Sequence, residues 1–216
     1  MPFVELNHPL REGMPVAPEL PAPGIGAVLT NKGSRPRREG SEFFLGTVDM
    51  SGNPGTHLDA PSHRFPGGQD LAGVPLEAVA GLPGLSIDAS SMQGREIRLS
   101  LDQHVVRGRA VLIRTGWDER WGTERYGDPG PYLAEELVDI LIRGKAWLVG
   151  VDSANVDDTG DSSRPVHTRL LAEGILIVEH LCNLGRLPTD GFRFFAVPLR
   201  LVGGTSFPVR AYAELD

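Results

Sequence analysis

The chain has 216 residues, of which 40% are hydrophobic and 23% are charged, and this composition excludes a wholly disordered protein. Its formal net charge of −7 argues against binding nucleic acid or an anionic membrane through bulk charge. Cys182 is the only cysteine, which excludes an intrachain disulfide and a zinc cluster built on several thiolates. The sequence opens without a basic and apolar leader and has no apolar run near the roughly 20 residues of a membrane span. We therefore expect a cytoplasmic protein with a small-molecule partner.

The first half of the chain predicts strands separated by irregular segments. There are 27 glycines and 18 prolines, which favour many turns. Residues 15–38 are dense in proline, glycine and arginine and are typical of a long irregular excursion. Residues 43–50 carry the aromatic and β-branched side chains of a strand, which the turn sequence Ser-Gly-Asn-Pro-Gly at 51–55 would end. Short apolar runs predict further strands at 85–88 and 111–113.

The second half alternates helical and extended patterns. Apolar residues recur at helical spacing over 132–143, with Pro131 before this segment and Gly144 after it, which predicts a helix. The other expected elements are a strand at 146–151, a helix at 165–173, and strands at 175–178, 194–202 and 209–213. Strand–helix–strand order favours parallel pairing, so the expected fold class is α/β, in a single domain that spans residues 1–216.

The densest concentration of chemically active side chains is Gly-Thr-His-Leu-Asp-Ala-Pro-Ser-His at 55–63. His57 and Asp59 are two residues apart, so on an extended segment both point to the same side. An imidazole and a carboxylate placed in this way form half of a site for a divalent metal. His63, beyond Pro61, could be a further ligand or a proton-transfer group near neutral pH. The spacing alone also fits a surface loop with incidental histidines.

A second candidate group lies more than a hundred residues later. His167 falls in the first turn of the helix expected at 165–173, and Glu179 follows the strand expected at 175–178. Carboxyl ends of parallel strands often line crevices, which favours a functional Glu179. The alternative is a glutamate that pairs with an arginine and a histidine that merely lies near a helix start.

Other polar and aromatic residues have less specific patterns. Three aspartates after a strand could bind metal, cap helices or face water: Asp152, Asp157 and Asp158. Three histidines have no obvious partner and are expected to be structural: His8, His104 and His180. Four aromatic residues could line an aromatic pocket or pack in the core: Phe43, Trp117, Trp121 and Phe207.

The stretch at 55–63 resembles the signature His-x-Gly-Thr-His-x-Asp-x-Pro-x-His of the cyclase family, which includes bacterial kynurenine formamidases and isatin hydrolases. Later segments are similar to further landmarks of that family, in the same order: Arg-Thr-Gly-Trp at 114–117, Val-Gly-Val-Asp-Ser at 149–153, Pro-Val-His at 165–167, Val-Glu-His-Leu at 178–181, Ala-Val-Pro-Leu-Arg at 196–200 and Phe-Pro-Val-Arg-Ala at 207–211. The resemblance covers the chain from about residue 6 onward. It implies a swivelling β/α/β fold, subunits that form dimers or larger assemblies, and hydrolysis of an amide or lactam on an aromatic ring.

The resemblance also implies roles for individual residues. His57 and Asp59 match ligands of a first Zn²⁺ or Mn²⁺ position, and Asp59 could bridge two ions. His167 and Glu179 match the pair that completes a second position. His63 matches the last histidine of the signature, which is either a ligand or the catalytic proton shuttle.

Asn53 departs from the pattern, because it stands where the signature has its first histidine. A neutral amide oxygen is a weaker ligand than imidazole for Zn²⁺ or Mn²⁺, so we expect one metal ion rather than two. Asn53 could instead hydrogen-bond substrate or orient a water molecule.

Three functions follow from the resemblance and from this departure. The favoured one is a metal-dependent hydrolase that acts on an amide or lactam of a small aromatic substrate. The second is a metal-weakened cyclase, dehydratase or lactonase that uses general acid–base chemistry. The third is a non-catalytic small-molecule binding protein. In each case we expect a homo-oligomer, a dimer or tetramer.

Overall fold

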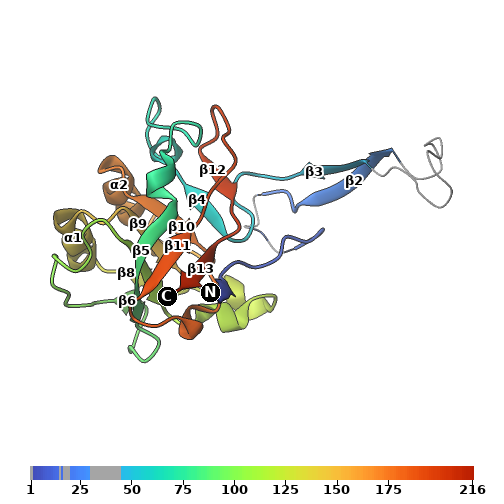
Figure 1. Cartoon of the computed structure of the whole chain (residues 1–216). Helices are drawn as coiled ribbons and strands as arrows, with labels where there is room; N and C mark the ends of the chain where they lie inside the picture. Colours follow the sequence, from blue (N-terminus) through green and yellow to red (C-terminus); the bar gives the residue numbers. More distant parts are fainter. Residues whose placement is uncertain (1, 15, 17–19, 30–44) are drawn as a thin grey trace.

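The computed structural model describes residues 2–14, 16, 20–29 and 45–216, and a nine-stranded sheet forms its centre (Figure 1). The strand order is β1-β13-β11-β5-β7-β9-β10-β4-β12. The strands of this sheet are β1 (Phe3–Glu5), β4 (His57–Asp59), β5 (Ala80–Asp88), β7 (Ala110–Arg114), β9 (Leu148–Val151), β10 (Leu176–Glu179), β11 (Phe192–Phe195), β12 (Ser206–Pro208) and β13 (Tyr212–Leu215). Two ribbons pair β2 (Gly24–Leu29) with β3 (Leu45–Asp49) and β6 (Glu96–Ile97) with β8 (Tyr132–Leu133).

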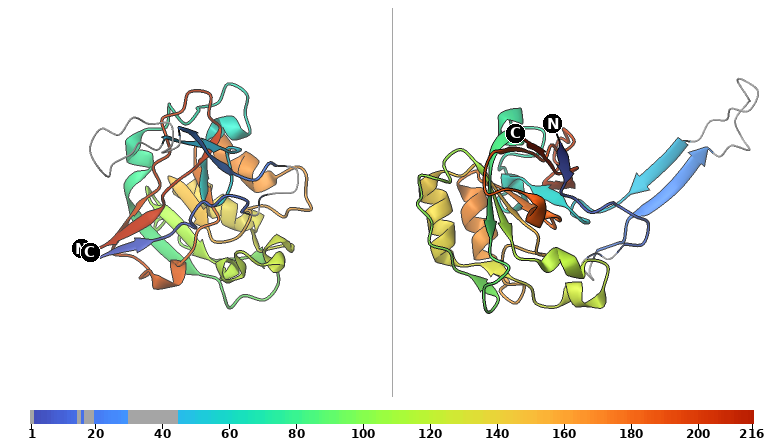
Figure 2. Two further views of the ribbon diagram at one scale, coloured as in Figure 1. Left: turned by 90° about the vertical axis from the view of Figure 1, so that its right-hand side faces the viewer. Right: turned by 60° about the horizontal axis from the view of Figure 1, so that its bottom comes forward.

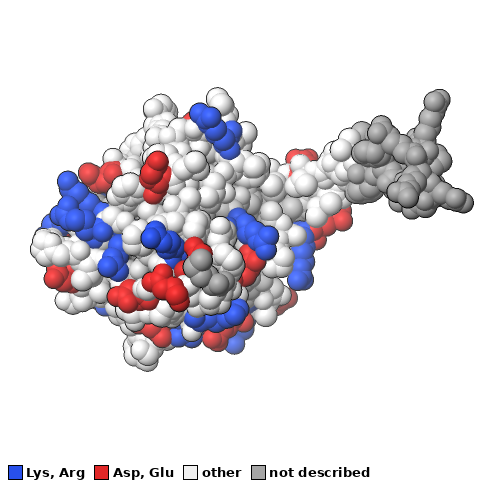
Figure 3. Space-filling model, viewed as in Figure 1, with Lys and Arg blue, Asp and Glu red and all other residues white. Residues whose placement is uncertain are grey.

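The helices are short. The α-helices are α1 (Glu135–Gly144) and α2 (Pro165–Ala172), and the 3-10 helices are η2 (Pro61–His63), η3 (Leu76–Ala78), η4 (Trp117–Arg120), η5 (Glu124–Gly127) and η6 (Leu184–Arg186). In the described part of the chain, no helix combines the length and apolarity that a bilayer span requires. Acidic and basic side chains are interspersed on the face drawn in Figure 3.

The centre of the sheet is parallel and its flanks are antiparallel. Strands β5, β7, β9 and β10 pair in parallel, whereas β4 runs antiparallel to β10. Helix α1 connects β7 to β9, and α2 connects β9 to β10, so the two crossovers account for the parallel pairing. This arrangement confirms the expected α/β fold class.

Alternate residues of the central strands feed two apolar cores, because successive side chains of a strand point to opposite faces. Val111 and Ile113 pack with the apolar stripe of α1 in one core. Leu112, between them, packs in the other core with residues of β4 and β11. Both α-helices cover the same face of the sheet, as Figures 1 and 2 show.

Strands β2 and β3 form an arm that projects away from the sheet (Figures 1 and 2). Three apolar side chains of the arm are at least half exposed: Ile25, Leu45 and Val48. Residues 15–38 were expected to be irregular, and this expectation was wrong for residues 24–29, which form strand β2. Residues 15, 17–19 and 30–44 lie outside the described residues, and they include Phe43 and the first positions of the strand expected at 43–50.

Several expected boundaries were wrong. The helix expected at 132–143 begins only at Glu135, because residues 132–133 pair with β6 as β8. Its end is also different: Gly144 is the last helical residue and Lys145 adopts the left-handed conformation. The strands expected at 194–202 and 209–213 are instead β11, β12 and β13, and the first of these already ends at Phe195.

Candidate metal centre

Two antiparallel strands form the frame of the candidate site. In the register of β4 and β10, His57 lies opposite Glu179, and Asp59 lies opposite Ile177. On its other edge β4 pairs with β12, so this three-residue strand is hydrogen-bonded on both sides. His57, Asp59 and Glu179 are all buried, and they occupy the same side of the two strands.

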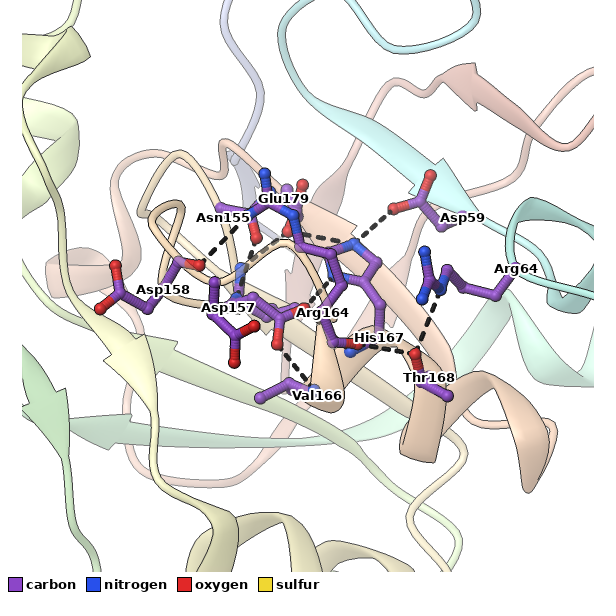
Figure 4. Close-up of polar contacts among 12 residues, drawn as sticks. Asp59, Arg64, Asn155, Asp157, Asp158, Arg164, Val166, His167, Thr168 and Glu179 are labelled. Atoms are coloured by element: carbon purple, nitrogen blue, oxygen red, sulfur yellow. Dashed lines mark hydrogen bonds and ion pairs between the residues drawn. The ribbon is translucent and has the colours of Figure 1, made fainter.

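Helix α2 brings His167 to the same place, and Asp157 fixes its ring. The Asp157 carboxylate accepts hydrogen bonds from the backbone nitrogens of Val166 (2.7 Å) and His167 (3.1 Å), the first-turn donors of α2. It also accepts one from His167 Nδ1 at 2.6 Å. Figure 4 shows His167 between Asp157 on one side and Asp59 and Glu179 on the other. Of the roles considered for the three aspartates, Asp157 therefore caps a helix and orients a histidine.

The polar atoms of these side chains converge on one small volume. His57 Nε2 lies 3.6 Å from Asp59 Oδ2 and 3.6 Å from Glu179 Oε2. His167 Nε2 lies 3.5 Å from Asp59 Oδ2 and 3.5 Å from Glu179 Oε1. Two ligands held tetrahedrally about 2.0–2.1 Å from one zinc ion would be roughly 3.3 Å apart. These separations therefore resemble the edges of a coordination polyhedron more than direct hydrogen bonds.

The imidazole tautomers suit a metal. His57 Nδ1 lies 2.8 Å from the carbonyl oxygen of Gly55, and His167 Nδ1 contacts Asp157. Because each acceptor takes a proton from Nδ1, both rings can present an unprotonated Nε2 toward the carboxylates. Glu179 is fixed in turn by the backbone nitrogen of Val156, which donates to its Oε1 at 2.7 Å.

The electrostatics of the site favour positive charge at its centre. Burial alone would lower the pKa of His57, but Asp59 and Glu179 raise it to about 9. Burial also opposes protonation of His167, whereas Glu179, Asp157 and Asp59 raise its pKa to about 10. Burial would raise the pKa of Asp59, but the facing histidines hold it well below its usual range.

The residues present fit a divalent cation. Both carboxylate oxygens of Asp59 are buried and have no hydrogen-bond partner among the described residues. A buried carboxylate left in this state is costly unless a cation compensates it. Asp59 and Glu179 together supply two negative charges, and the histidines supply neutral nitrogen donors. Two overlapping sets of potential ligands meet at Asp59: His57, Asp59 and Glu179, and Asp59, His63 and His167.

His63 lies at the margin of this group. His63 Nδ1 is 3.8 Å from Asp59 Oδ1, and the His63 side chain retains 31% of its exposure. Burial, with the nearby His167 and His57, lowers the pKa of His63 despite the opposing charge of Asp59. Asn53 is partly buried, four residues before His57.

Four ring side chains form a contact network that reaches His57 through His180, and only Trp121 among them was considered as a pocket residue from the sequence. The ring of His180 lies 5.5 Å from the ring of His57, and its Nδ1 is 2.7 Å from the hydroxyl of Tyr126. The ring of His8 stacks on Trp121 at 4.0 Å. The sequence indicated no obvious partner for either histidine, whereas the structure stacks His8 on Trp121 and joins His180 to Tyr126. No local pattern would have revealed these contacts, because they join the N-terminal segment, the η4–η5 region and the end of β10.

The remaining sequence candidates lie elsewhere. Asp152 accepts hydrogen bonds from the backbone nitrogens of Thr115 and Gly116, so it fixes a turn after β7. Asp158 pairs with Arg95. Trp117 is buried, and its indole nitrogen donates to the carbonyl oxygen of Tyr126.

Comparisons with known proteins agree with this architecture. The family model for the cyclases, described as "Putative cyclase", matches residues 4–158. A kynurenine formamidase from Bacillus cytotoxicus is 31% identical over 176 residues, which cover 81% of this chain and 82% of that protein. A kynurenine formamidase from Erythrobacter litoralis is 30% identical over 207 residues, which cover 96% of this chain and 91% of that protein.

Solved structures show the same fold. Isatin hydrolase A from Labrenzia aggregata, bound to benzyl benzoate, is 26% identical with a TM-score of 0.80, and the match covers 99% of this chain and 93% of that one. Isatin hydrolase A from Ralstonia solanacearum is 24% identical with a TM-score of 0.81, and the match covers 100% of this chain and 92% of that one. The chain belongs to the cyclase family, which confirms the resemblance seen in the sequence.

Proposed function

We propose that this protein is a metal-dependent hydrolase that cleaves an amide or lactam on a small aromatic substrate. The observation that carries the proposal is the buried group of His57, Asp59, His167 and Glu179. It is supported by relatives at 30–31% identity that are named kynurenine formamidases. A structural neighbour at 26% identity, an isatin hydrolase, points to the same reaction type at a carbon–nitrogen bond.

The proposed cofactor is one tightly bound Zn²⁺ or Mn²⁺ ion. Imidazole nitrogens together with carboxylates suit both metals. One ion is favoured over two because Asn53 offers only an amide where the family signature has a histidine, which weakens one of the two positions.

A divalent ion held there would acidify a bound water and polarise the carbonyl group of the substrate. In this proposal His63 moves the proton. Its lowered pKa keeps it neutral near pH 7, so it can accept a proton from the attacking water. It then delivers that proton to the leaving nitrogen, and its partial exposure lets it reach the substrate. Asp157 and the backbone nitrogen of Val156 keep His167 and Glu179 in place throughout.

Metal analysis combined with a small substrate panel tests this function. Protein purified without chelator should carry about one Zn²⁺ or Mn²⁺ per chain and hydrolyse formanilide or isatin. Chelation should abolish turnover, and the ion should restore it. Glu179→Gln should lose metal and activity together, whereas Glu173→Gln, an exposed glutamate after α2, should retain both. Full metal loading without hydrolysis of any amide or lactam would contradict the proposal, and turnover of lactones alone would favour the acid–base alternative.

We also propose that the protein is a homo-oligomer, with the β2–β3 arm packed on a second copy. A two-stranded ribbon is at best marginally stable by itself in water. The exposed Ile25, Leu45 and Val48 give the arm apolar surface that its own chain leaves uncovered among the described residues. Light scattering of wild type and Val48→Asp tests this: wild type should be a dimer or tetramer, and the variant should shift toward monomer.

A further inference from the structure

A cavity of about 480 Å³ lies at the amino-terminal edge of β9 and β10, away from the candidate metal centre. Helix α1 leads into β9 and α2 leads into β10, so both helices end at this edge of the sheet. The candidate ligand Glu179 lies at the opposite, carboxyl end of β10. The volume falls within the roughly 300–1,000 Å³ that is typical of small-molecule sites. Much of the wall is apolar and comes from Val74, Pro75, Ala78, Ile142, Ile175 and Leu176.

Two oppositely charged side chains line this cavity from equivalent positions before neighbouring strands. In the register of β9 and β10, Leu148 lies opposite Leu176. Lys145 and Glu173 each lie three residues before one of these partners, and both line the cavity. Each also directly follows a helix, Lys145 after α1 and Glu173 after α2. Neighbouring strands run about 4.8 Å apart, so an ammonium and a carboxylate group start from adjacent points of the wall.

Both charged groups are free to bind a ligand. Other charges on the same two helices pair within the chain, since Arg143 of α1 and Arg169 of α2 both contact Asp139. Among the described residues, by contrast, Lys145 and Glu173 form an ion pair neither with each other nor with another side chain. A lysine offers only donors and a glutamate carboxylate only acceptors. The cavity therefore has separate partners for an anionic group and for a cationic group.

Trp147 adds an aromatic surface beside these charges. It lines the cavity and is 42% exposed, although the next two residues of the chain, Leu148 and Val149, are fully buried. Its Nε1–H has no hydrogen-bond partner among the described residues. An exposed indole suits a second aromatic ring, which packs on it in an offset or edge-on arrangement. The cavity thus combines an aromatic surface, a positive group and a negative group, and this combination selects a ligand more narrowly than an apolar groove does.

We propose that this cavity binds a free aromatic α-amino acid, with its carboxylate on Lys145, its ammonium group on Glu173 and its ring against Trp147. An α-amino acid carries both charged groups on one carbon atom, which matches a lysine and a glutamate at adjacent points of one wall. Its ring matches the indole and the apolar lining. The inference goes beyond the proposed hydrolase function and does not depend on it, because none of these residues belongs to the candidate ligand sets.

Calorimetry with three probes tests the inference on the full-length protein. The probes are L-phenylalanine, 3-phenylpropionate, which lacks the ammonium group, and 2-phenylethylamine, which lacks the carboxylate. Wild type should bind L-phenylalanine roughly three- to tenfold more tightly than either analogue, as one partly exposed charge-assisted hydrogen bond provides. Glu173→Gln should abolish the preference over 3-phenylpropionate and keep the preference over 2-phenylethylamine. Lys145→Gln should do the reverse.

Two further variants separate the contribution of the ring from that of charge in general. Trp147→Leu should weaken all three probes by a similar factor, because the ring is common to them. Glu136→Gln, an exposed glutamate in the first turn of α1, is the matched control and should leave all three affinities unchanged. Lys145 and Glu173 are exposed, so their glutamine variants should keep the thermal stability of wild type.

Three results would overturn the proposal. They are no binding of L-phenylalanine at millimolar concentration, equal binding of the three probes by wild type, and preferences that Glu173→Gln and Lys145→Gln leave unchanged. The last result would place the amino acid at another site, such as a bound metal ion, which amino and carboxylate groups also bind. The titration is therefore repeated with chelator present. The preferences should persist there, and their loss would count equally against the cavity, whether or not the protein hydrolyses an amide.

Discussion

Replacing Asp157 with asparagine should weaken metal binding although Asp157 is not itself a proposed ligand. The carboxylate accepts from His167 Nδ1 and from the backbone nitrogens of Val166 and His167. Asparagine has the same shape, but only its oxygen can accept, and its NH₂ group would face a donor. In Asp157→Asn at least one of the three hydrogen bonds is therefore lost, and the preference of His167 for protonated Nδ1 is relaxed.

The size of the effect follows from these contacts. A hydrogen bond from a buried donor to a charged acceptor contributes about 1.5–3 kcal/mol. A negative charge at the first turn of a helix adds about 0.3–1 kcal/mol, and α2 begins at Pro165, close to Asp157. We therefore expect a loss of roughly 2–4 kcal/mol in the free energy of unfolding of metal-free protein. Metal affinity should fall about 10- to 100-fold, as for other groups that orient a metal-bound histidine.

Two measurements check this prediction. Urea unfolding in the presence of chelator gives the stability change, and competition with a chromogenic chelator gives the zinc affinity. Asp158→Asn is the matched control, because Asp158 is the neighbouring carboxylate but makes a partly exposed ion pair with Arg95. It should change stability by less than about 1 kcal/mol and leave zinc affinity unchanged. If Asp157→Asn binds zinc within twofold of wild type, Asp157 does not orient His167 for a metal.

Three further predictions concern other parts of the molecule. Asn53→His should raise metal affinity by adding an imidazole near the ligand set, and an unchanged zinc titration would show that position 53 does not face the metal. Gly144→Ala should destabilise the protein by roughly 1–3 kcal/mol in thermal unfolding, because its Cβ would lie 2.2 Å from a methyl carbon of Val106; helix propensity alone predicts a gain instead. Burial lowers the pKa of His8 from 6.5 to about 4, so the unfolded chain binds more protons between these values and stability falls as the pH drops through them. Urea unfolding at both pH values checks this. Between pH 7 and pH 4.5 the free energy of unfolding should fall by roughly 1 kcal/mol less in His8→Gln than in wild type, after allowance for the partial exposure of His8.

The accuracy of the sequence predictions depended on whether the determining contacts are local. Helix α2 was predicted within one residue, because Pro165 and the apolar spacing after it are local signals. Residues 132–133 were wrongly placed in a helix, since their backbone pairs with β6, a strand some 35 residues earlier. Gly144 was likewise placed after the helix, whereas it is the last helical residue of α1. Val106 and the Gln103 backbone leave no space for a side chain at this position, so close packing rather than a helix end explains the glycine.

The residues of the candidate site also divide into those that local spacing predicts and those that only tertiary structure brings together. The two-residue spacing of His57 and Asp59 was enough to place both on one side of a strand, as β4 has them. Spacing did not connect this pair to His167 and Glu179, and only the resemblance to the family did. The orienting role of Asp157 and the contacts of His180 depend on side chains brought together by tertiary structure, so no pattern in the sequence distinguishes them.

The pairing of β4 on both edges has a consequence for the choice of metal. His57 and Asp59 lie on a strand that β10 and β12 hold from either side, so their Cα positions have little freedom to follow an ion of unsuitable radius. Calcium prefers oxygen ligands at about 2.3–2.6 Å in a flexible shell of six to eight donors, and a frame of this kind cannot expand to supply them. Discrimination among ions should therefore come as much from the stiffness of the sheet as from the identity of the donor atoms, and substitutions that loosen the β4–β12 edge should broaden the range of metals bound.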